Sequence, residues 1–414
     1  MTIIKTSRSL VDALFMPFLL LTTVMMSGCS SRQVLDPEDS VVRLSNGASL
    51  KSEVDRLVIP LIDSEENIGA VVAVLDQNQQ SSVFAYGHKD KDKKTKLSGD
   101  TLFGIGSTTK SLVVSLLLAM DDQGVVSLDD TIADLLPAEL TFADPRIRDI
   151  TFGQLASHTS GLPREPVKFE SLAALWHYFF TGDNLYSHLT DEAVYTYLQE
   201  FELPSDLDDA PTYSNIGVGL LAHFLTLKTG QDLETLLNTY ILQELDMQNT
   251  VIKLTPEATM RLATGYSGDQ PWFIERNTPL DNWIFSSVML GTGGVYSTAE
   301  DLIKYLKAHL RQSGTKLDTI LQQSRTIMGE DGRHFLTMGW YVDYLPDYDR
   351  HFYYYHGMIS GFNCYIGFEP ETEIAVVVLR NNFNWQDKVG HNLLLRMSEF
   401  LRLEQSQDVN ISSP

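Results

Sequence analysis

Cysteine is almost absent from this chain of 414 residues, which contains only Cys29 and Cys364. Two cysteines are too few for a disulfide framework, so a hydrophobic core must hold the fold together. Hydrophobic residues make up 43% of the sequence and charged residues 21%, an ordinary balance that excludes disorder for the bulk of the chain. We expect Cys364 to be a single thiol, buried in a strand.

Positive charge is also scarce. The sequence has 31 lysine and arginine residues against 54 aspartate and glutamate residues, which gives a formal net charge of −23. Nucleic acid binding needs a basic surface that attracts phosphate, so nucleic acid is not an expected partner. An acidic surface instead suits a soluble body that works near an anionic bilayer without lying on it.

Spacings typical of metal and nucleotide sites are missing as well. The 10 histidines form no H-E-x-x-H motif and no Cys/His pair, so no metal ion is expected. The segment from Gly104 to Ser111 is similar to a phosphate-binding loop, but Thr109 stands where that loop needs its second glycine. We therefore expect no nucleotide and no other cofactor.

The N-terminus has an apolar run that is too short to span a bilayer. Lys5 and Arg8 precede apolar residues 13–26, whereas a transmembrane helix needs roughly 20 such residues. This is the pattern of a secretory signal peptide. The run ends in Met26-Ser27-Gly28-Cys29, which resembles a bacterial lipobox with Met26 in place of the usual leucine. A plain signal peptide followed by an unrelated cysteine is the alternative.

We therefore expect residues 1–28 to be a lipoprotein signal peptide and residues 29–48 a tether. Lipidation of Cys29 would anchor the protein to a membrane. Ser30 after the cysteine resembles the outer-membrane address of Gram-negative lipoproteins. For a Gram-negative bacterium, the expected location is the periplasmic side of the outer membrane.

Apolar periodicity divides the rest of the chain into strands at both ends and helices between them. An antiparallel sheet made from both ends, flanked by helices and carrying an inserted, mostly helical domain, is the simplest α+β arrangement. The expected body covers residues 49–405, with an α/β part at 49–140 and 290–405, a helical part at 141–289 and a tail at 406–414. Alternation predicts strands at 68–76, 81–87, 352–355, 362–368 and 374–380. Helical spacing predicts helices at 107–124, 152–158, 172–180, 216–229, 233–245, 299–309 and 389–403.

The most informative segment holds Ser107 and Lys110 at the start of a predicted helix. Residues three apart share one helix face, so the two side chains can meet. A serine hydroxyl becomes a nucleophile when a base takes its proton, and a lysine can act as that base if burial lowers its pKa. The helix N-terminus would favour a developing oxyanion. A helix-capping serine beside a surface lysine is the structural alternative.

A second segment, Pro211-Thr212-Tyr213-Ser214-Asn215, comes directly before another predicted helix. Tyr213 and Asn215 are two residues apart in an extended piece, so they can point the same way. A tyrosine beside a cationic lysine can lose its proton more easily and act as a general base. Asn215 offers a donor and an acceptor to a substrate amide. A buried tyrosine and a capping asparagine are the alternative.

A third segment, Tyr355-His356-Gly357-Met358, lies in a predicted strand. Glycine within a strand marks the close approach of another chain or of a ligand. Taken alone, His356 would more often be structural than functional.

These three segments, in this order, resemble the serine β-lactamase and penicillin-binding-protein superfamily. The Tyr-x-Asn element points to its class C branch of β-lactamases, D-alanyl-D-alanine peptidases and related esterases. Two further runs, at residues 155–163 and 291–298, are also similar to that family, and the resemblance covers roughly residues 50–400. It implies a β-lactamase/DD-peptidase-like fold, with Ser107 as acylated nucleophile, Lys110 and Tyr213 moving protons, and Asn215 holding the substrate amide.

The third segment departs from the family pattern. β-Lactamases have Lys-Thr-Gly there, and many peptidases and esterases begin with histidine. Without a gap, Tyr355 takes the first position and His356 the middle one, and the N–H of Met358 beyond Gly357 would complete an oxyanion hole with that of Ser107. A one-residue deletion would instead bring His356 to the first position. Both registers lack the lysine, a permanent cation suited to a substrate carboxylate.

We therefore expect an extracytoplasmic serine acyl hydrolase. The first hypothesis is a penicillin-binding D-alanyl-D-alanine peptidase acting on peptidoglycan peptides, because the run from His158 continues with Arg164 and Glu165 and in this length resembles the peptidase-type penicillin-binding proteins. An esterase or other amide hydrolase, a class C β-lactamase, and a non-catalytic binding lipoprotein are the alternatives. Expected partners are a small-molecule or peptide substrate and a membrane through Cys29.

Overall fold

The computed structural model describes residues 50–136, 140–166, 168–206, 210–330, 334–345, 350–385 and 388–411. The predicted signal peptide, Cys29 and the tether lie outside these residues. None of the helices in the described ranges is both long and apolar enough to cross a membrane.

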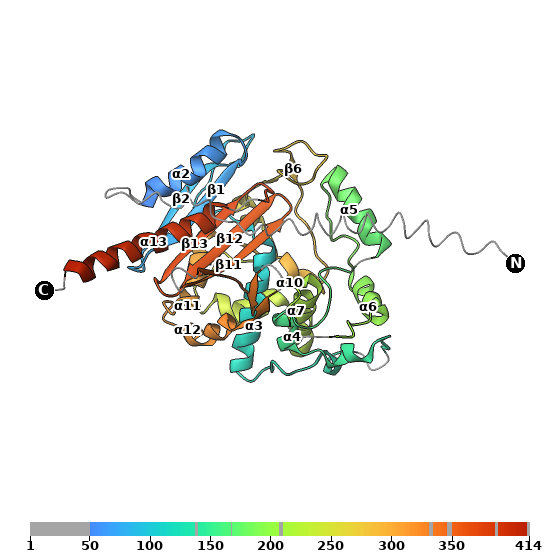
Figure 1. Ribbon diagram of the computed structural model, residues 1–414. Coiled ribbons are helices and arrows are strands. Elements are labelled where there is room, and N and C mark those ends of the chain that lie inside the picture. Colours follow the sequence, from blue (N-terminus) through green and yellow to red (C-terminus); the bar gives the residue numbers. More distant parts are fainter. Residues whose placement is uncertain are drawn as a thin grey trace, which may run out of the picture. The chain divides into compact units, whose positions relative to one another are not determined.

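Within the described part of the chain, nine strands form one antiparallel sheet in the order β3-β2-β1-β13-β12-β11-β10-β9-β8 (Figure 1). Both ends of the chain therefore supply the sheet, and strands from the two ends meet where β1 pairs with β13, with Val72 opposite Val378. The mixed fold with a large antiparallel sheet is confirmed. The strands are β1 Gly69–Leu75, β2 Ser81–Asp90, β3 Thr95–Lys96, β8 Ile327–Glu330, β9 Phe335–Thr337, β10 Tyr341–Leu345, β11 Arg350–Ile359, β12 Phe362–Glu369 and β13 Ile374–Arg380.

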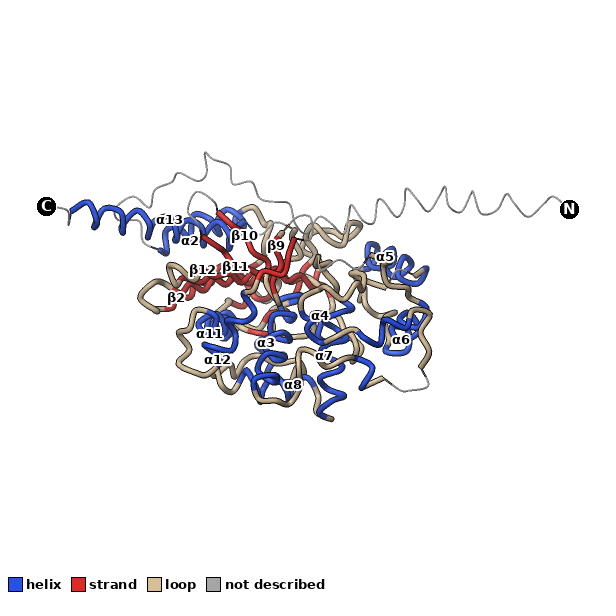
Figure 2. Tube along the Cα trace, turned by 60° about the horizontal axis from the view of Figure 1, so that its bottom comes forward, coloured by secondary structure: helices blue, strands red, loops and turns tan. Residues whose placement is uncertain are grey.

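Helices cover both faces of this sheet (Figure 2). Helices α2 (Leu50–Asp63) and α13 (Lys388–Ile411) contact each other and pack on one face, where α13 lies against β12 and β13. On the other face α11 (Ala299–His309) contacts β1, β12 and β13. The central strands β1, β12 and β13 are buried along their whole length, as strands between two helical layers should be.

The helical region packs below that second face, around α3. Helix α3 is buried at all of its first 12 positions, from Thr109 to Met120, so it runs through the core and not over its surface. It contacts α7, α8 and α10, which join the helical region to the sheet in one hydrophobic core. The remaining helices are α4 Phe152–Ala156, α5 Phe169–Thr181, α6 Asp191–Glu200, α7 Asn215–Thr229, α8 Leu233–Leu237, α9 Pro256–Arg261, α10 Leu290–Gly293 and α12 Leu317–Ile320.

The structure refines several element boundaries. The predicted helix at 107–124 divides into a short 3-10 turn, η2 (Gly106–Thr108), and α3 (Thr109–Asp122). The closing helix runs to Ile411, past the expected end of the body at residue 405. Strands β8, β9 and β10 were not predicted; in β8 and β9 the exposed and buried residues do not alternate regularly. Cys364 lies fully buried in β12, as expected.

Candidate active site

Ser107 lies in η2, between the two-residue strand β4 (Phe103–Gly104) and helix α3. It is partly exposed, whereas residues 101–106 and 108–120 around it are all buried. Gly106 holds this turn against β11: its φ is +51°, and a Cβ there would lie 2.7 Å from the backbone nitrogen of Met358. Only glycine fits such a position, so the chain presents one serine hydroxyl at the junction of the sheet and the helical region.

Lys110 is fully buried one turn further along, in α3. Its Nζ donates to Ser107 Oγ over 3.1 Å and to the backbone oxygen of Thr292, in α10, over 2.7 Å. Burial lowers the pKa of Lys110, and the nearby Tyr213 opposes that shift. A lysine with a lowered pKa that contacts the serine hydroxyl can accept its proton.

Tyr213 lies almost wholly buried between two cations and two rings. Lys110 Nζ is 5.3 Å and Arg164 Cζ 5.0 Å from its ring centroid, and the rings of His158 and Tyr341 lie 4.9 Å and 6.0 Å away. Burial on its own would raise the pKa of Tyr213, but the charges of Lys110 and then Arg164 outweigh it, so the pKa lies below its usual value of 10.0. The hydroxyl of Ser107 contributes to the same lowering.

His158 supports Tyr213 without adding a charge. Its Nδ1 accepts a hydrogen bond from the backbone N–H of Ser214 over 3.1 Å, which leaves the proton on the other ring nitrogen. Burial, followed by the charges of Lys110 and Arg164, lowers the pKa of His158 to about 3. The ring is therefore neutral and serves to position Tyr213.

Asn215 is the first residue of α7, and its side chain lies buried beside a carboxylate. Ser214 caps the helix, since its Oγ accepts from Gly217 N–H over 2.9 Å. The Nδ2 of Asn215 donates to Glu165 Oε1 and, over 3.3 Å, to the Tyr186 hydroxyl. Tyr186 donates its own proton to Glu165 Oε1 over 2.7 Å.

In the third segment Tyr355 lies on the side of β11 that faces η2, which agrees with the gapless register. A Cβ on Gly357 would lie 1.8 Å from Ile105 O and 2.8 Å from Thr108 Oγ1, so the Gly357 side of β11 faces η2. Tyr355 is two residues away and shares that face, where it lowers the pKa of Tyr213. Its buried hydroxyl makes no hydrogen bond of good geometry among the described residues.

His356 points to the opposite face of the sheet. The prediction that it lines the substrate site is therefore wrong. Its ring lies 5.1 Å from the ring of Tyr365 and 5.4 Å from that of Tyr354, on the side that α13 covers. The reason is the alternation of a strand: once Tyr355 and Gly357 face η2, the residue between them cannot.

The backbone of Met358, in β11, lies next to the turn that carries Ser107. The pairing of β10 with β11 ends at Tyr354, so residues 355–359 have no β10 partner along that edge. Gly106 packs directly against the Met358 backbone, next to Ser107. The Met358 backbone therefore lies beside the turn that carries Ser107, which is compatible with the predicted oxyanion hole.

Three residues that sequence reasoning did not assign complete the site: Arg164, Glu165 and Thr292. Each lies in a run that resembles the family, but only the structure shows that these loops reach Lys110 and Tyr213. Within the described ranges, no group of His, Cys, Asp and Glu side chains could hold a metal ion.

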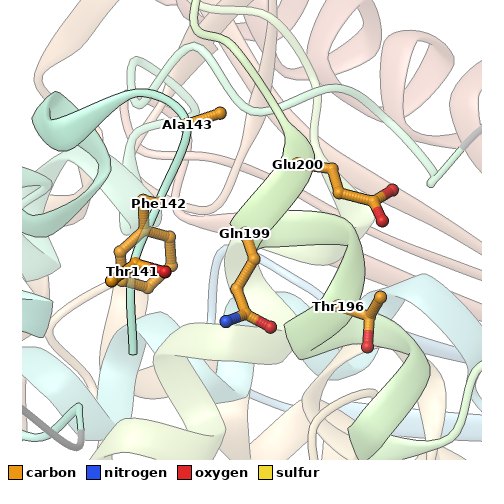
Figure 3. Close-up of a pocket in the computed structure, with 6 residues that line it drawn as sticks. All are labelled: Thr141, Phe142, Ala143, Thr196, Gln199 and Glu200. Atoms are coloured by element: carbon orange, nitrogen blue, oxygen red, sulfur yellow. The ribbon is translucent and has the colours of Figure 1, made fainter. Parts of the chain in front are cut away.

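A separate hollow of about 580 Å³ lies beside α6 (Figure 3). Phe142 and Gln199 face each other across it, and it shares no residue with the site around Ser107. Its lining residues are Thr141, Phe142, Ala143, Thr196, Gln199 and Glu200.

A serine, a buried lysine and a tyrosine that meet at the junction of an antiparallel sheet and a helical region are typical of β-lactamase-like proteins. A solved class C beta-lactamase superposes with a TM-score of 0.70 at 21% identity, covering 85% of this chain and 96% of its own. The family model for beta-lactamase matches residues 54–397. The chain therefore belongs to the beta-lactamase family, as its motifs predicted.

Two curated relatives are similar in sequence. "Protein flp" of Staphylococcus aureus (strain NCTC 8325 / PS 47) is 24% identical over 343 residues, which are 82% of this chain and 64% of flp. "D-alanyl-D-alanine-carboxypeptidase/endopeptidase AmpH" of Escherichia coli (strain K12) is 28% identical over 258 residues, 62% of this chain and 61% of AmpH. The chain thus spans less than two thirds of the length of each.

Proposed function

We propose that the protein is a serine acyl hydrolase that works through an acyl-enzyme on Ser107. One observation carries this proposal: the partly exposed Ser107 hydroxyl accepts a hydrogen bond from Lys110, which is itself fully buried and has a lowered pKa. Tyr213, whose pKa is also lowered, lies within reach of both. Acyl transfer requires a base that takes the proton of the serine hydroxyl, and Lys110 and Tyr213 both lie close enough to Ser107 to do so.

The proposed reaction has two balanced steps. Ser107 Oγ bonds to the substrate carbonyl carbon while its proton passes to the pair of Lys110 and Tyr213. The N–H groups of Ser107 and Met358 bind the oxyanion, the bond to the leaving group breaks, and the leaving group takes the proton. A water molecule then attacks the acyl-enzyme by the same route and releases the acid, which restores the Ser107 hydroxyl.

The first candidate substrate class is the D-alanyl-D-alanine peptide of peptidoglycan. The relative AmpH is named a "D-alanyl-D-alanine-carboxypeptidase/endopeptidase", and the run from His158 to Glu165 resembles peptidase-type penicillin-binding proteins. The lipobox-like Cys29 supports an anchored location on the periplasmic side of the outer membrane, where peptidoglycan is accessible.

An esterase or other amide hydrolase is the second candidate, and Tyr355 is the observation that favours it. A β-lactam or a D-alanine-terminal peptide offers a carboxylate, which a lysine at the Tyr355 position would bind. Tyr355 is buried and burial raises its pKa, so it stays uncharged. A purely binding role is disfavoured because the serine, lysine and tyrosine are all present and in contact.

The test uses purified protein and a Ser107→Ala variant with a fluorescent penicillin, a D-alanyl-D-alanine peptide and p-nitrophenyl acetate. Stable labelling that requires Ser107, together with release of D-alanine, supports the peptidase. Rapid turnover of penicillin supports a β-lactamase, and ester hydrolysis alone supports an esterase. If no substrate depends on Ser107, the acyl-enzyme proposal is wrong.

A further inference from the structure

Two buried oxygen atoms beside the candidate site have no hydrogen-bond donor. They are Oε2 of Glu165 and Oδ1 of Asn215, and neither finds a partner among the described residues. Asn215 is only 3% exposed, so water does not freely reach its side chain. A buried polar atom without a partner loses the stabilisation that water would have given it, and such atoms are rare in folded proteins.

The donors of Asn215, Tyr186 and Lys110 are directed to other acceptors. The Nδ2 of Asn215 and the hydroxyl of Tyr186 both donate to the other carboxylate oxygen, Glu165 Oε1. Lys110 donates to Ser107 and to the Thr292 backbone. Glu165 and Asn215 are therefore held together through Oε1, and each keeps one oxygen that accepts no hydrogen bond from a described residue.

Aromatic rings lie on one side of this pair, and the charges of Arg164 and Lys110 also act on Glu165. The Tyr186 ring lies 5.6 Å from the ring of Trp283 and 5.1 Å from that of Phe285. In such a setting a carboxylate gains most from a donor that also carries positive charge, because charge-assisted hydrogen bonds strengthen as the local dielectric falls. A primary ammonium group has three donors and no acceptor, which suits two acceptor oxygens of which one is anionic.

We propose that Glu165 Oε2 and Asn215 Oδ1 together bind a primary ammonium group on the acyl part of the substrate. The inference rests on the proposed function, because Asn215 is expected to hold the acyl side of the substrate next to Ser107. It names a substrate class, aminoacyl compounds and peptides with a free ammonium near the reacting carbonyl. Glu165 is then a specificity-determining residue.

The protonation of Glu165 fits this role and also defines the competing explanation. Burial raises its pKa, against hydrogen bonds from Tyr186 and Asn215 and the charges of Arg164 and Lys110. A bound ammonium would lower it again and hold the carboxylate ionised. Without a ligand, a protonated Oε2–H could instead satisfy Asn215 by itself, and the pair would have no specificity.

The Glu165→Gln substitution separates the two explanations because it keeps the shape and removes the charge. Hydrolysis of the p-nitrophenyl esters of glycine and propionate would be measured, since these acyl groups differ only by ammonium in place of methyl. We expect E165Q to reduce kcat/KM for the glycine ester at least about tenfold more than for the propionate ester, the scale of a hydrogen bond to a charged group. β-Alanine and butyrate esters give a second pair with one more methylene.

Glu170 provides the matched control, because it is exposed on α5 only five residues away and removing its charge leaves the acceptor pair intact. E170Q should leave the glycine-to-propionate ratio unchanged. Tyr186→Phe should lower the ratio partly, since the Tyr186 hydroxyl stabilises the ionised form of Glu165. If E165Q lowers kcat/KM equally for both esters, or for neither, the inference is overturned while the hydrolase proposal remains intact.

Calorimetry with glycinamide and propionamide separates this inference from the proposed function. If the wild-type chain hydrolyses no ester but binds glycinamide more tightly than propionamide, and E165Q abolishes that difference, the ammonium site stands and the hydrolase proposal falls. Equal binding of the two amides by an inactive chain would refute both.

Discussion

Replacing Lys110 by methionine should destroy activity while leaving the fold almost as stable as before. The substitution removes the Nζ that contacts Ser107 Oγ at 3.1 Å and keeps the length of the side chain within the core. Loss of a general base costs about 10²–10⁴-fold in rate. We expect a loss of that size in kcat/KM for p-nitrophenyl acetate and in the rate of labelling by penicillin.

The stability of K110M follows from two opposing effects. The backbone oxygen of Thr292 loses its donor, which costs about 1 kcal/mol. A fully buried ammonium, whose charged form burial disfavours, disappears at the same time, and such replacements are often neutral or stabilising. The free energy of unfolding at pH 7 should therefore stay within about 2 kcal/mol of wild type.

The pH dependence of the free energy of unfolding tests separately whether the pKa of Lys110 is lowered. Burial holds the pKa of Lys110 below the value of 10.5 that it has in the unfolded chain. Between those two values the unfolded state binds more protons, so the stability of wild type rises with pH. K110M lacks this contribution, and its stability relative to wild type should fall as pH approaches 10.5, as urea denaturation at a series of pH values would show.

Lys304 supplies the control. It is a surface lysine that pairs with Asp246 over 2.9 Å, so K304M should cost at most about 1 kcal/mol and leave activity unchanged. Lys110 is not the base of Ser107 if K110M keeps activity within a few-fold of wild type. Loss of activity only because K110M no longer folds would also contradict the prediction.

Three further predictions concern the neighbours of Lys110. Arg164→Ala should raise the pKa of Tyr213, so the acid limb of the kcat/KM profile moves to higher pH, whereas R164K keeps the charge and should move it less; no difference between them would contradict the electrostatic role. Tyr355→Lys should lower KM for substrates with a free carboxylate relative to their amides, and an unchanged ratio would show that this position does not meet the carboxylate. Gly106→Ala places a Cβ against Met358 at a φ of +51°, so urea denaturation should show a loss of about 1–3 kcal/mol, and a neutral effect would mean that the turn can move away from β11.

The sequence was sufficient for those parts of the site where local spacing decides which side chains can meet. Ser107 and Lys110 are three apart at a helix start, and the structure brings them into contact as expected. Gly357 within a strand predicted a close approach, and its missing Cβ leaves room for Ile105 O. In each case a single turn or strand sets the geometry, so neighbouring residues carry the information.

Longer-range features could not be derived in the same way. Which of Tyr355 and His356 faces Ser107 depends on how β11 is aligned against η2, and that alignment involves segments about 250 residues apart in the chain. Glu165 meets Asn215 across 50 residues, between a loop whose path no periodicity describes and the start of α7. Alternation along β11 shows that Tyr355 and His356 face opposite sides, but it does not show which of these sides meets η2.

Acylation of Ser107 can be detected by peptide mapping with mass spectrometry. Purified protein would be incubated with penicillin or with p-nitrophenyl acetate, quenched in acid and digested. We expect an acyl adduct on the peptide that contains Ser107 in the wild-type protein. Its formation should be about 10²–10⁴-fold slower in K110M, and it should be absent from Ser107→Ala. Turnover of either compound that persists in Ser107→Ala, or an adduct on another residue, would contradict the proposed acyl-enzyme on Ser107.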